Sequence, residues 1–248
     1  MSNSSLVNYT AISPFKTSPR NHKIDTVTIH VMGGDFSVET CGNIFQRKNR
    51  NASSNYGIGS DGRIGLYVDE KDRSWCSSNR ANDMRAITIE VANDGGAATG
   101  WHVSDKAMES LINLLVDICQ RNGINALIYS SNKTDRVNHL NGCNMTLHRD
   151  FAVTKACPGQ YLVGEHPWIA EQVNARLNGE PLPAPSGLPY KVKIDCDVLN
   201  VRKGPGVGYK VVMQVHRGEV YTITAEQNGW GKLKSGAGWI YLKYTQRI

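Results

Sequence analysis

The segment of residues 145–161 carries an imidazole, an amine and a thiol on His148, Lys155 and Cys157. A Pro-Gly pair follows Cys157 and favours a loop, because it does not continue a helix or a central strand. A loop can aim several side chains at one point, and imidazole and thiolate are ligands that zinc prefers. A catalytic zinc needs three protein ligands and a water, so this segment predicts two ligands, His148 and Cys157, and requires a third from elsewhere.

His30 is the best donor of the third ligand. It ends a β-branched run, residues 25–30, which alternates like a strand and stops before Gly33 and Gly34. A histidine at the end of a strand is held where a rigid scaffold presents a ligand. The spacing alone also suits a simpler interpretation, in which the histidines belong to the core and the thiol is free and buried.

Four motifs, in chain order, resemble those of zinc-dependent N-acetylmuramoyl-L-alanine amidases, the family shared by phage endolysins, bacterial autolysins and peptidoglycan-recognition proteins. They are the strand that ends in His30, the segment 55–64, the run 86–93 around Glu90, and His148 followed by Lys155-Ala-Cys157-Pro-Gly. The resemblance covers about residues 20–175. It implies an α/β fold with a central mixed β-sheet flanked by helices. It also implies Zn2+ as the cofactor, held by His30, His148 and Cys157.

Two positions depart from the family pattern. Close relatives often carry a second histidine directly after the first ligand, where this chain has Val31. Because neighbouring strand residues point to opposite faces, we expect no loss of the metal. Some members use an aspartate where Cys157 stands; a thiolate donates more charge and softens the Lewis acidity of the metal.

Three further residues receive catalytic roles from the resemblance. Glu90 alternates with Ile89 and Val91 in the pattern of a strand, and it is the expected general base. Lys155 is expected to offer its charge to the tetrahedral intermediate, and Tyr56 to donate to the same oxyanion or to orient the water. From the residues alone, Glu90 could equally be a surface carboxylate and Lys155 a solvated loop side chain.

The expected reaction is hydrolysis of the amide between the lactyl group of N-acetylmuramic acid and the L-alanine of the stem peptide. Two alternatives stay open. In a cysteine peptidase of the cell wall, Cys157 and His148 would form a nucleophile–base pair without a metal. Against this, Cys157 precedes Pro-Gly instead of opening a helix that would lower its pKa. A peptidoglycan-binding module without catalysis is the second alternative, although such members usually lack the thiol ligand.

Local signals predict the elements around these residues. Ser37 and Ser104 are expected helix N-caps, and the Ser104 helix ends at Gly123. The turn at residues 60–62 predicts a hairpin, and the apolar run 126–129 predicts a buried strand. We expect a last helix over residues 168–177 and a loop over 75–84 that lines a substrate groove.

The chain divides into an expected catalytic domain at residues 1–178, a proline-rich linker at 179–189 and a small β-domain at 190–248. The last piece resembles a bacterial SH3-like barrel, which in that family usually holds an enzyme on the cell wall. Its aromatic residues divide into expected core positions (Trp230, Trp239) and expected groove positions (Tyr209, Tyr241, Tyr244).

The formal net charge of +6 lies entirely in the C-terminal piece: residues 187–248 hold 10 Lys+Arg and 4 Asp+Glu, whereas residues 1–186 hold 18 of each. This asymmetry indicates a surface that meets an anionic polymer, such as a wall polymer. A nucleic acid is also an anionic polymer, but the sequence contains no nucleic-acid-binding motif that would support it as the partner. The expected partners are therefore peptidoglycan and, through the basic domain, anionic wall polymers, with no nucleic acid and no membrane.

The N-terminal residues lack a basic start followed by an apolar core, and no apolar run is long enough to span a bilayer. We therefore expect no signal peptide and a cytoplasmic protein that reaches the wall at lysis. That pattern is more typical of a phage or prophage lysin than of an exported autolysin. The six cysteines show no paired spacing, so we expect free thiols.

Overall fold

The computed structural model describes residues 2–179, 189–227 and 229–248, and the chain divides into two compact units, residues 1–182 and 183–248. The division falls inside the segment 179–189 that the sequence predicts as a linker; residues 180–188 lie outside the described residues. The domain limits given above therefore stay a prediction.

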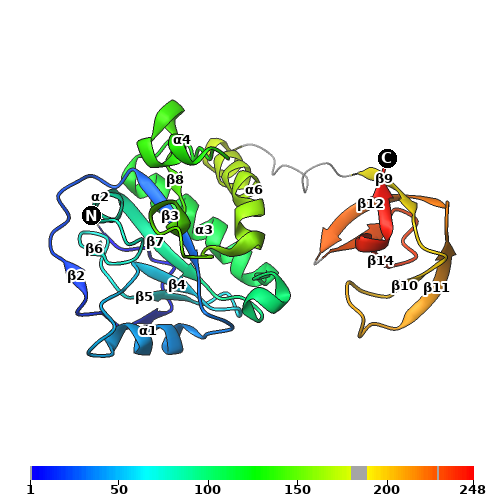
Figure 1. Cartoon of the computed structure of the whole chain (residues 1–248), viewed down its shortest axis with the longest axis horizontal. Coiled ribbons are helices and arrows are strands. Elements are labelled where there is room, and N and C mark those ends of the chain that lie inside the picture. The colour runs from blue at the N-terminus through cyan, green and yellow to red at the C-terminus, as the bar shows by residue number, and fades with distance from the viewer. Residues whose placement is uncertain (1, 180–188, 228) are drawn as a thin grey trace. The chain divides into compact units, whose positions relative to one another are not determined.

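A six-stranded mixed sheet forms the centre of the N-terminal unit, in the order β1-β5-β4-β7-β3-β8 (Figure 1). Only the β4–β5 pair is antiparallel; the other neighbours run parallel. A separate ribbon pairs β2 with β6. The strands span β1 (Tyr9–Thr10), β2 (Lys16–Thr17), β3 (Thr26–Val31), β4 (Tyr56–Ile58), β5 (Ile64–Leu66), β6 (Arg73–Ser74), β7 (Ala86–Val91) and β8 (Met145–Thr146).

Helices cover both faces of this sheet. The larger core lies under α3 and α6 and takes in the side chains of Ile29, Ile87 and Ile89, whereas α1 closes a smaller core on the other side. The helices are α1 (Val38–Gln46), α2 (Arg80–Arg85), α3 (Asp105–Asn122), α4 (Lys133–Asn138), α5 (His148–Phe151) and α6 (Gly159–Asn178), with single turns η1 (Gly96–Thr99) and η2 (Leu140–Gly142). Within the described residues, no helix combines the length and apolarity needed to cross a membrane.

The two faces of the central strands β3 and β7 differ in polarity. Ile29 and Ile89 face the core under α3 and α6, so the alternation of a strand sends their neighbours to the opposite face. That face is lined by buried hydroxyls: Thr28 bonds Thr146, and Thr88 bonds Ser74. His30 and Glu90 follow on the same face, at the carboxyl ends of the two strands, and pair in register. The polar face therefore ends in the groups that could do chemistry.

Several local predictions are confirmed. The side chain of Ser37 accepts a hydrogen bond from Thr40 N, and that of Ser104 accepts one from Ala107 N, so both cap their helices. Gly123 ends α3 in the left-handed region, with φ +66°. The turn at 60–62 joins the antiparallel pair β4–β5.

The buried strand expected at residues 126–129 is wrong. Those residues form no ladder, because two asparagine side chains satisfy their backbone. Asn174 accepts from Leu127 N and donates to Leu127 O, and Asn144 accepts from Ile128 N and donates to Ala126 O. Side chains far along the chain thus replace a neighbouring strand.

The last helix was expected to begin at Trp168, but α6 begins at Gly159, directly after Pro158. A proline is tolerated at the start of a helix because the first amide groups have no partner there in any case. The Pro-Gly pair therefore marks the start of α6 and not merely the end of a loop. This corrects the argument that no helix follows Cys157.

The C-terminal unit is an all-β domain, as predicted. Among the described residues, seven strands follow the order β11-β10-β14-β13-β12-β9-β15, and neighbouring strands pair antiparallel. A small core of aliphatic side chains fills it, and Trp230 is buried while Trp239 is half-buried. The strands are β9 (Tyr190–Ile194), β10 (Val198–Arg202), β11 (Val211–His216), β12 (Val220–Gln227), β13 (Trp230–Leu233), β14 (Trp239–Tyr241) and β15 (Thr245–Arg247), with a single turn η3 (Leu242–Tyr244). The predicted fold class, α/β followed by a small all-β barrel, is confirmed.

Candidate metal centre and cleft

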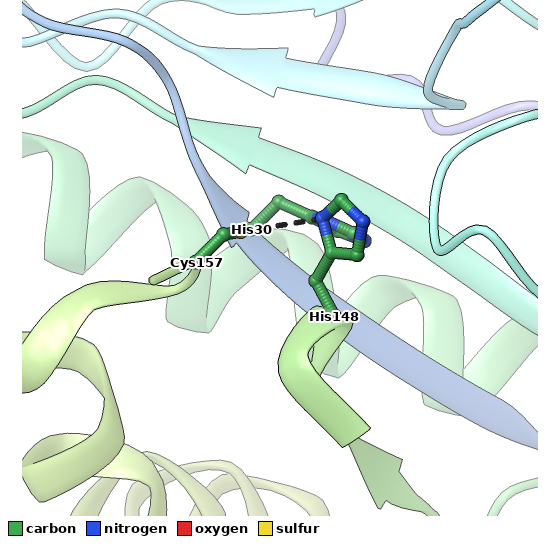
Figure 2. Close-up of side chains that lie close together, drawn as sticks. All are labelled: His30, His148 and Cys157. Carbon is green, nitrogen blue, oxygen red and sulfur yellow. Dashed lines mark hydrogen bonds between the residues drawn. The ribbon is translucent and has the colours of Figure 1, made fainter. Parts of the chain in front are cut away.

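His30, His148 and Cys157 come together although they are far apart in the sequence (Figure 2). One ligand atom of each residue lies within 4.8 Å of those of the other two. Sγ of Cys157 is 3.4 Å from Nδ1 of His30, and the centroids of the two imidazole rings are 4.9 Å apart. The structure therefore contains a group of residues that can bind a metal ion.

Backbone and side-chain contacts hold these groups in place. Val31 N donates to Sγ of Cys157 over 3.4 Å, while the side chain of Val31 packs against the core on the other face, as its strand position predicts. Arg149 N donates to Cys157 O, which ties the two ligand segments together. Ser78 Oγ lies 3.2 Å from Nε2 of His148 and orients its ring.

The chemistry of this group fits a divalent metal. Among the described residues, Nε2 of His30 is buried without a hydrogen-bond partner, an arrangement that is costly unless something else binds there. Burial, followed by the charge of His148, lowers the pKa of His30 well below its usual value; burial and then Lys155 lower the pKa of His148. Both imidazoles are thus held neutral, the form that binds metals. Burial and then Glu90 raise the pKa of the Cys157 thiol, a penalty that a bound cation would offset.

Glu90 lies beside this group, opposite His30 across the β3–β7 pair. Burial raises its pKa to about 7, against a smaller lowering by Arg50 and by the Cys76 thiol, whose Sγ lies 3.9 Å from Oε1. His30, Cys76 and Glu90 also form a second set whose ligand atoms lie within 4.8 Å of one another. A carboxyl group with this pKa can exchange a proton near neutral pH.

A cleft of about 520 Å³ opens at these groups. Glu90, His148 and the exposed Lys155 line it, so the structure brings Lys155 to the same opening as the ligand His148. The loop at 75–84 contributes to the wall, as predicted, with Trp75, Cys76, Ser78, Asn79, Arg80 and Asp83. Sequence reasoning missed Cys76 and Ser78 individually; the Ser- and Asn-rich composition of the loop was their only signal.

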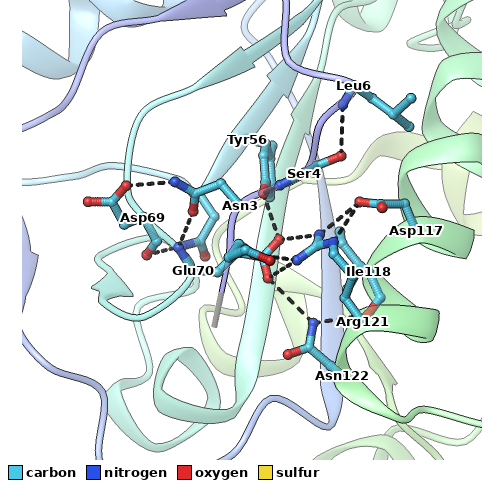
Figure 3. A network of polar contacts seen from close by, with 12 residues as sticks. Asn3, Ser4, Leu6, Tyr56, Asp69, Glu70, Asp117, Ile118, Arg121 and Asn122 are labelled. Atoms are coloured by element: carbon cyan, nitrogen blue, oxygen red, sulfur yellow. Dashed lines mark hydrogen bonds and ion pairs between the residues drawn. The ribbon is translucent and has the colours of Figure 1, made fainter.

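The prediction that Tyr56 lines this site is wrong. Tyr56 pairs with Ile89, and not with Glu90, so its ring belongs to the apolar face and is fully buried. Its hydroxyl donates to Oε1 of Glu70 over 2.6 Å and accepts from Ser4 N (Figure 3). Figure 3 shows Tyr56 inside a separate polar network with Glu70 and Arg121.

The C-terminal unit has a groove of its own, of about 380 Å³, whose lining includes Trp230, Tyr241 and Tyr244. Two of the three predicted groove tyrosines lie there. Tyr209, the third, packs over Gly204 instead and is not among the lining residues.

Comparison with known proteins gives two family matches. Residues 20–160 match the family model described as N-acetylmuramoyl-L-alanine amidase, and residues 197–246 match the model described as bacterial SH3 domain. YrvJ of Bacillus subtilis (strain 168), provisionally described as an N-acetylmuramoyl-L-alanine amidase, is 40% identical over 45 residues. That match covers 18% of this chain and only 9% of the curated relative.

Solved structures share the fold of the N-terminal unit. The structure of PlyL is 15% identical with a TM-score of 0.50 and covers 67% of this chain and 96% of its own. A selenomethionine derivative of AmpD is 16% identical with a TM-score of 0.52, again covering 67% and 96%. At these identities the likeness concerns the fold alone.

Proposed function

The chain belongs to the N-acetylmuramoyl-L-alanine amidase family, and we propose that it hydrolyses the amide bond between N-acetylmuramic acid and the L-alanine of the peptidoglycan stem. The observation that carries this proposal is the convergence of His30, His148 and Cys157 beside Glu90, with His148 and Glu90 lining one cleft. This donor set of two imidazoles and one thiol suits Zn2+, the cofactor that we propose. When bound, Zn2+ polarises a carbonyl group and lowers the pKa of a bound water toward ~7.

The side chains around the ligands have separate roles in this proposal. Glu90, with a pKa of about 7, takes a proton from the attacking water and returns it to the leaving amine. Lys155, exposed at the cleft, offers its charge to the oxyanion. Tyr56 has no part in the reaction, because its hydroxyl is bound to Glu70 on the other side of the sheet.

The thiol environment favours a ligand over a nucleophile. A cysteine nucleophile needs a lowered pKa and a base, yet burial raises the pKa of Cys157. The sulfur of Cys157 lies 3.4 Å from Nδ1 of His30, whereas the peptidase alternative requires His148 as its base. These contacts support the metal-dependent hydrolase.

We propose that the C-terminal unit holds the enzyme on the wall. Its aromatic groove, with Trp230, Tyr241 and Tyr244, gives a surface for an uncharged part of the polymer. The excess of Lys and Arg over Asp and Glu in residues 187–248 would favour anionic wall polymers.

Digestion of purified cell walls tests the proposed reaction. The walls are incubated with the protein, with and without a zinc chelator, and the newly exposed amino group is identified. We expect fresh N-terminal alanine, which disappears on chelation and returns when Zn2+ is added back. A different new terminus that is indifferent to chelation would support the cysteine peptidase, and no new terminus on several wall types would support a binding protein.

A further inference from the structure

A second group of side chains that can bind a metal ion lies beside the first. His30, Cys76 and Glu90 each offer one ligand atom, and these atoms lie within 4.8 Å of one another. Sγ of Cys76 is 3.9 Å from Oε1 of Glu90. His30 belongs to both groups, so the second group adds a thiol and a carboxylate. The reaction proposed above gives Cys76 no role.

The fold holds the three side chains of this second group in place. His30 and Glu90 pair in register on the neighbouring strands β3 and β7. The side chain of Asp83, a residue that is 1% exposed, accepts a hydrogen bond from Cys76 N over 3.0 Å and so fixes the loop that carries the thiol. The group therefore rests on two strands and a braced loop, which is the support that a metal site needs.

The imidazole of His30 can serve both groups, because its two nitrogens lie on different sides of the ring. Nδ1 lies 3.4 Å from Sγ of Cys157, a member of the first group. Nε2 is buried and, within the described part of the chain, has no hydrogen-bond partner. When Nδ1 binds one ion, Nε2 is left as a donor for another.

The donor types of the second group select the ion. Thiolate, imidazole and carboxylate are all ligands of zinc, whereas magnesium and calcium prefer oxygen ligands. The thiolate and the carboxylate together match the charge of a divalent cation. Cys76 and Glu90 line the cleft, so an ion can reach them from the solvent.

We propose that His30, Cys76 and Glu90 form a second, weaker position for Zn2+, and that an ion bound there inhibits the enzyme. Only the inhibition rests on the proposed function, because the ion would bind the carboxylate that acts as the general base. Two features weaken this position. The positive charge of Arg50 acts on Glu90, and the His30 ring must release a proton when both positions are filled.

Titration with cadmium tests the second position without relying on activity. In the full chain with His148→Ala and Cys157→Ala, the two cysteines that are not buried are Cys76 and Cys196. Cd2+ favours thiolate ligands, and its bond to a thiolate absorbs in the ultraviolet. We expect one equivalent of Cd2+ to bind with this absorption. Adding Cys76→Ser should remove the absorption and weaken binding by at least about 10-fold, the smallest loss typical even for a group that only supports a ligand.

Cys196→Ser in the same double variant is the matched control. Cys196 is half-buried like Cys76, but it belongs to the C-terminal unit. This control should keep both the absorption and the affinity for Cd2+. Far-UV circular dichroism establishes that each variant is folded. A folded double variant that binds no Cd2+ through a thiolate, or whose binding is the same after Cys76→Ser, would overturn the second position.

Calorimetric titration of the unsubstituted chain with Zn2+ covers the case in which the double variant does not fold. A second, weaker equivalent should bind to the parent and to Cys196→Ser but not to Cys76→Ser. A single equivalent in the parent, or a second equivalent that survives Cys76→Ser, would refute the site.

The inhibition is measured separately, on a soluble muramoyl peptide that contains the L-alanine amide. Excess Zn2+ beyond the first equivalent should slow hydrolysis by the parent, and Cys76→Ser should need at least about 10-fold more zinc for the same fractional inhibition. Equal inhibition of parent and variant would refute the inhibitory role. If no peptide is hydrolysed at any zinc concentration, the proposed function fails, and the two metal titrations still decide whether the second position exists.

Discussion

Two polar clusters in the N-terminal unit use similar residue types but differ in how many hydrogen-bond partners their buried side chains have. In the network of Figure 3, Glu70 accepts from Tyr56, from two nitrogens of Arg121 and from Asn122, and Arg121 also binds Asp117 and Ser2 O. At the candidate metal centre, Nε2 of His30 has no partner among the described residues, and Glu90 has a thiol 3.9 Å away. Both clusters lie against the same sheet.

This difference distinguishes a buried carboxylate that stabilises the fold from one that could take part in a reaction. A buried carboxylate with several donors holds chain segments together, as Glu70 holds the N-terminal residues to α3. A buried carboxylate with few donors is destabilised in its charged form, which is why the pKa of Glu90 rises to about 7. At the second cluster, a metal and a substrate would supply the partners that Nε2 of His30 and the carboxylate of Glu90 lack.

Removal of a metal ligand should produce the largest effect on activity. His148→Ala should lower wall hydrolysis by at least about 10³-fold, because two ligands hold zinc poorly and the metal supplies several kcal/mol to the reaction. Zinc per chain after dialysis and the rate of wall hydrolysis check this prediction. Full zinc content with unchanged hydrolysis would place the metal elsewhere.

Removal of Arg121 should affect stability and leave the chemistry alone. Arg121→Ala strips two donors from the fully buried Glu70, so the free energy of unfolding should fall by about 3 kcal/mol. Urea unfolding measures the loss, while kcat/KM is assayed well below the midpoint. Two results would contradict a purely structural role for the Glu70 network: a variant as stable as the parent, or a variant that is fully folded but has a lower kcat.

The pH dependence of stability should reveal Glu90 in the metal-free protein. Burial raises the pKa of Glu90 in the folded state from its ordinary value of 4.5 to about 7, so the folded state favours the protonated form. The unfolding free energy therefore falls as pH rises from 4.5 to about 7 and then levels off. Because Glu90 is partly exposed, the loss should be on the order of 2 kcal/mol.

Glu90→Gln removes this titration, so the chelated variant should match the parent at pH 4 and exceed its stability at pH 8 by that amount. Urea unfolding at several pH values gives the comparison. Asp83, whose pKa burial also raises, titrates in both proteins and cancels in the difference. Parallel stability curves for parent and variant would mean that the carboxyl group of Glu90 is not desolvated.

The metal ligands and Glu90 could be predicted because their positions follow from local rules. Strand alternation puts His30 and Glu90 on one face, and parallel strands bring their carboxyl ends to the same edge. The helix caps at Ser37 and Ser104 depend only on side chains three residues away. The residue types within one predicted loop indicated His148 and Cys157 as further ligands, and the family resemblance supported that pairing.

Positions set by distant partners could not be predicted. Cys76 reaches Glu90 because Asp83 binds the backbone of the loop at Cys76 and Ser77. The absence of a strand at 126–129 depends on Asn144 and Asn174, which the local pattern does not include. An apolar run predicts that a segment is buried. Which groups bind its backbone N–H and C=O groups depends on the whole fold.

Tyr56 shows how a single register decides a role. The turn at residues 60–62 predicts a hairpin, but it does not tell whether Tyr56 or Gly57 stands opposite Glu90. The observed pairing of Gly57 with Glu90 sends Tyr56 to the other face, because a shift of one residue exchanges the faces of a strand. The tyrosine therefore joins Glu70 and not the metal ligands.

Tyr56→Phe gives the smallest expected change and tests that placement directly. The variant loses the hydrogen bond to Glu70 and the one accepted from Ser4 N, while Arg121 and Asn122 still satisfy Glu70, so the unfolding free energy should fall by about 2 kcal/mol. Zinc content and kcat/KM on walls should stay within about twofold of the parent, since the hydroxyl lies on the other side of the sheet from Glu90. A kcat loss of 100-fold or more, with stability unchanged, would return Tyr56 to the oxyanion and show that β4 has another register in the working enzyme.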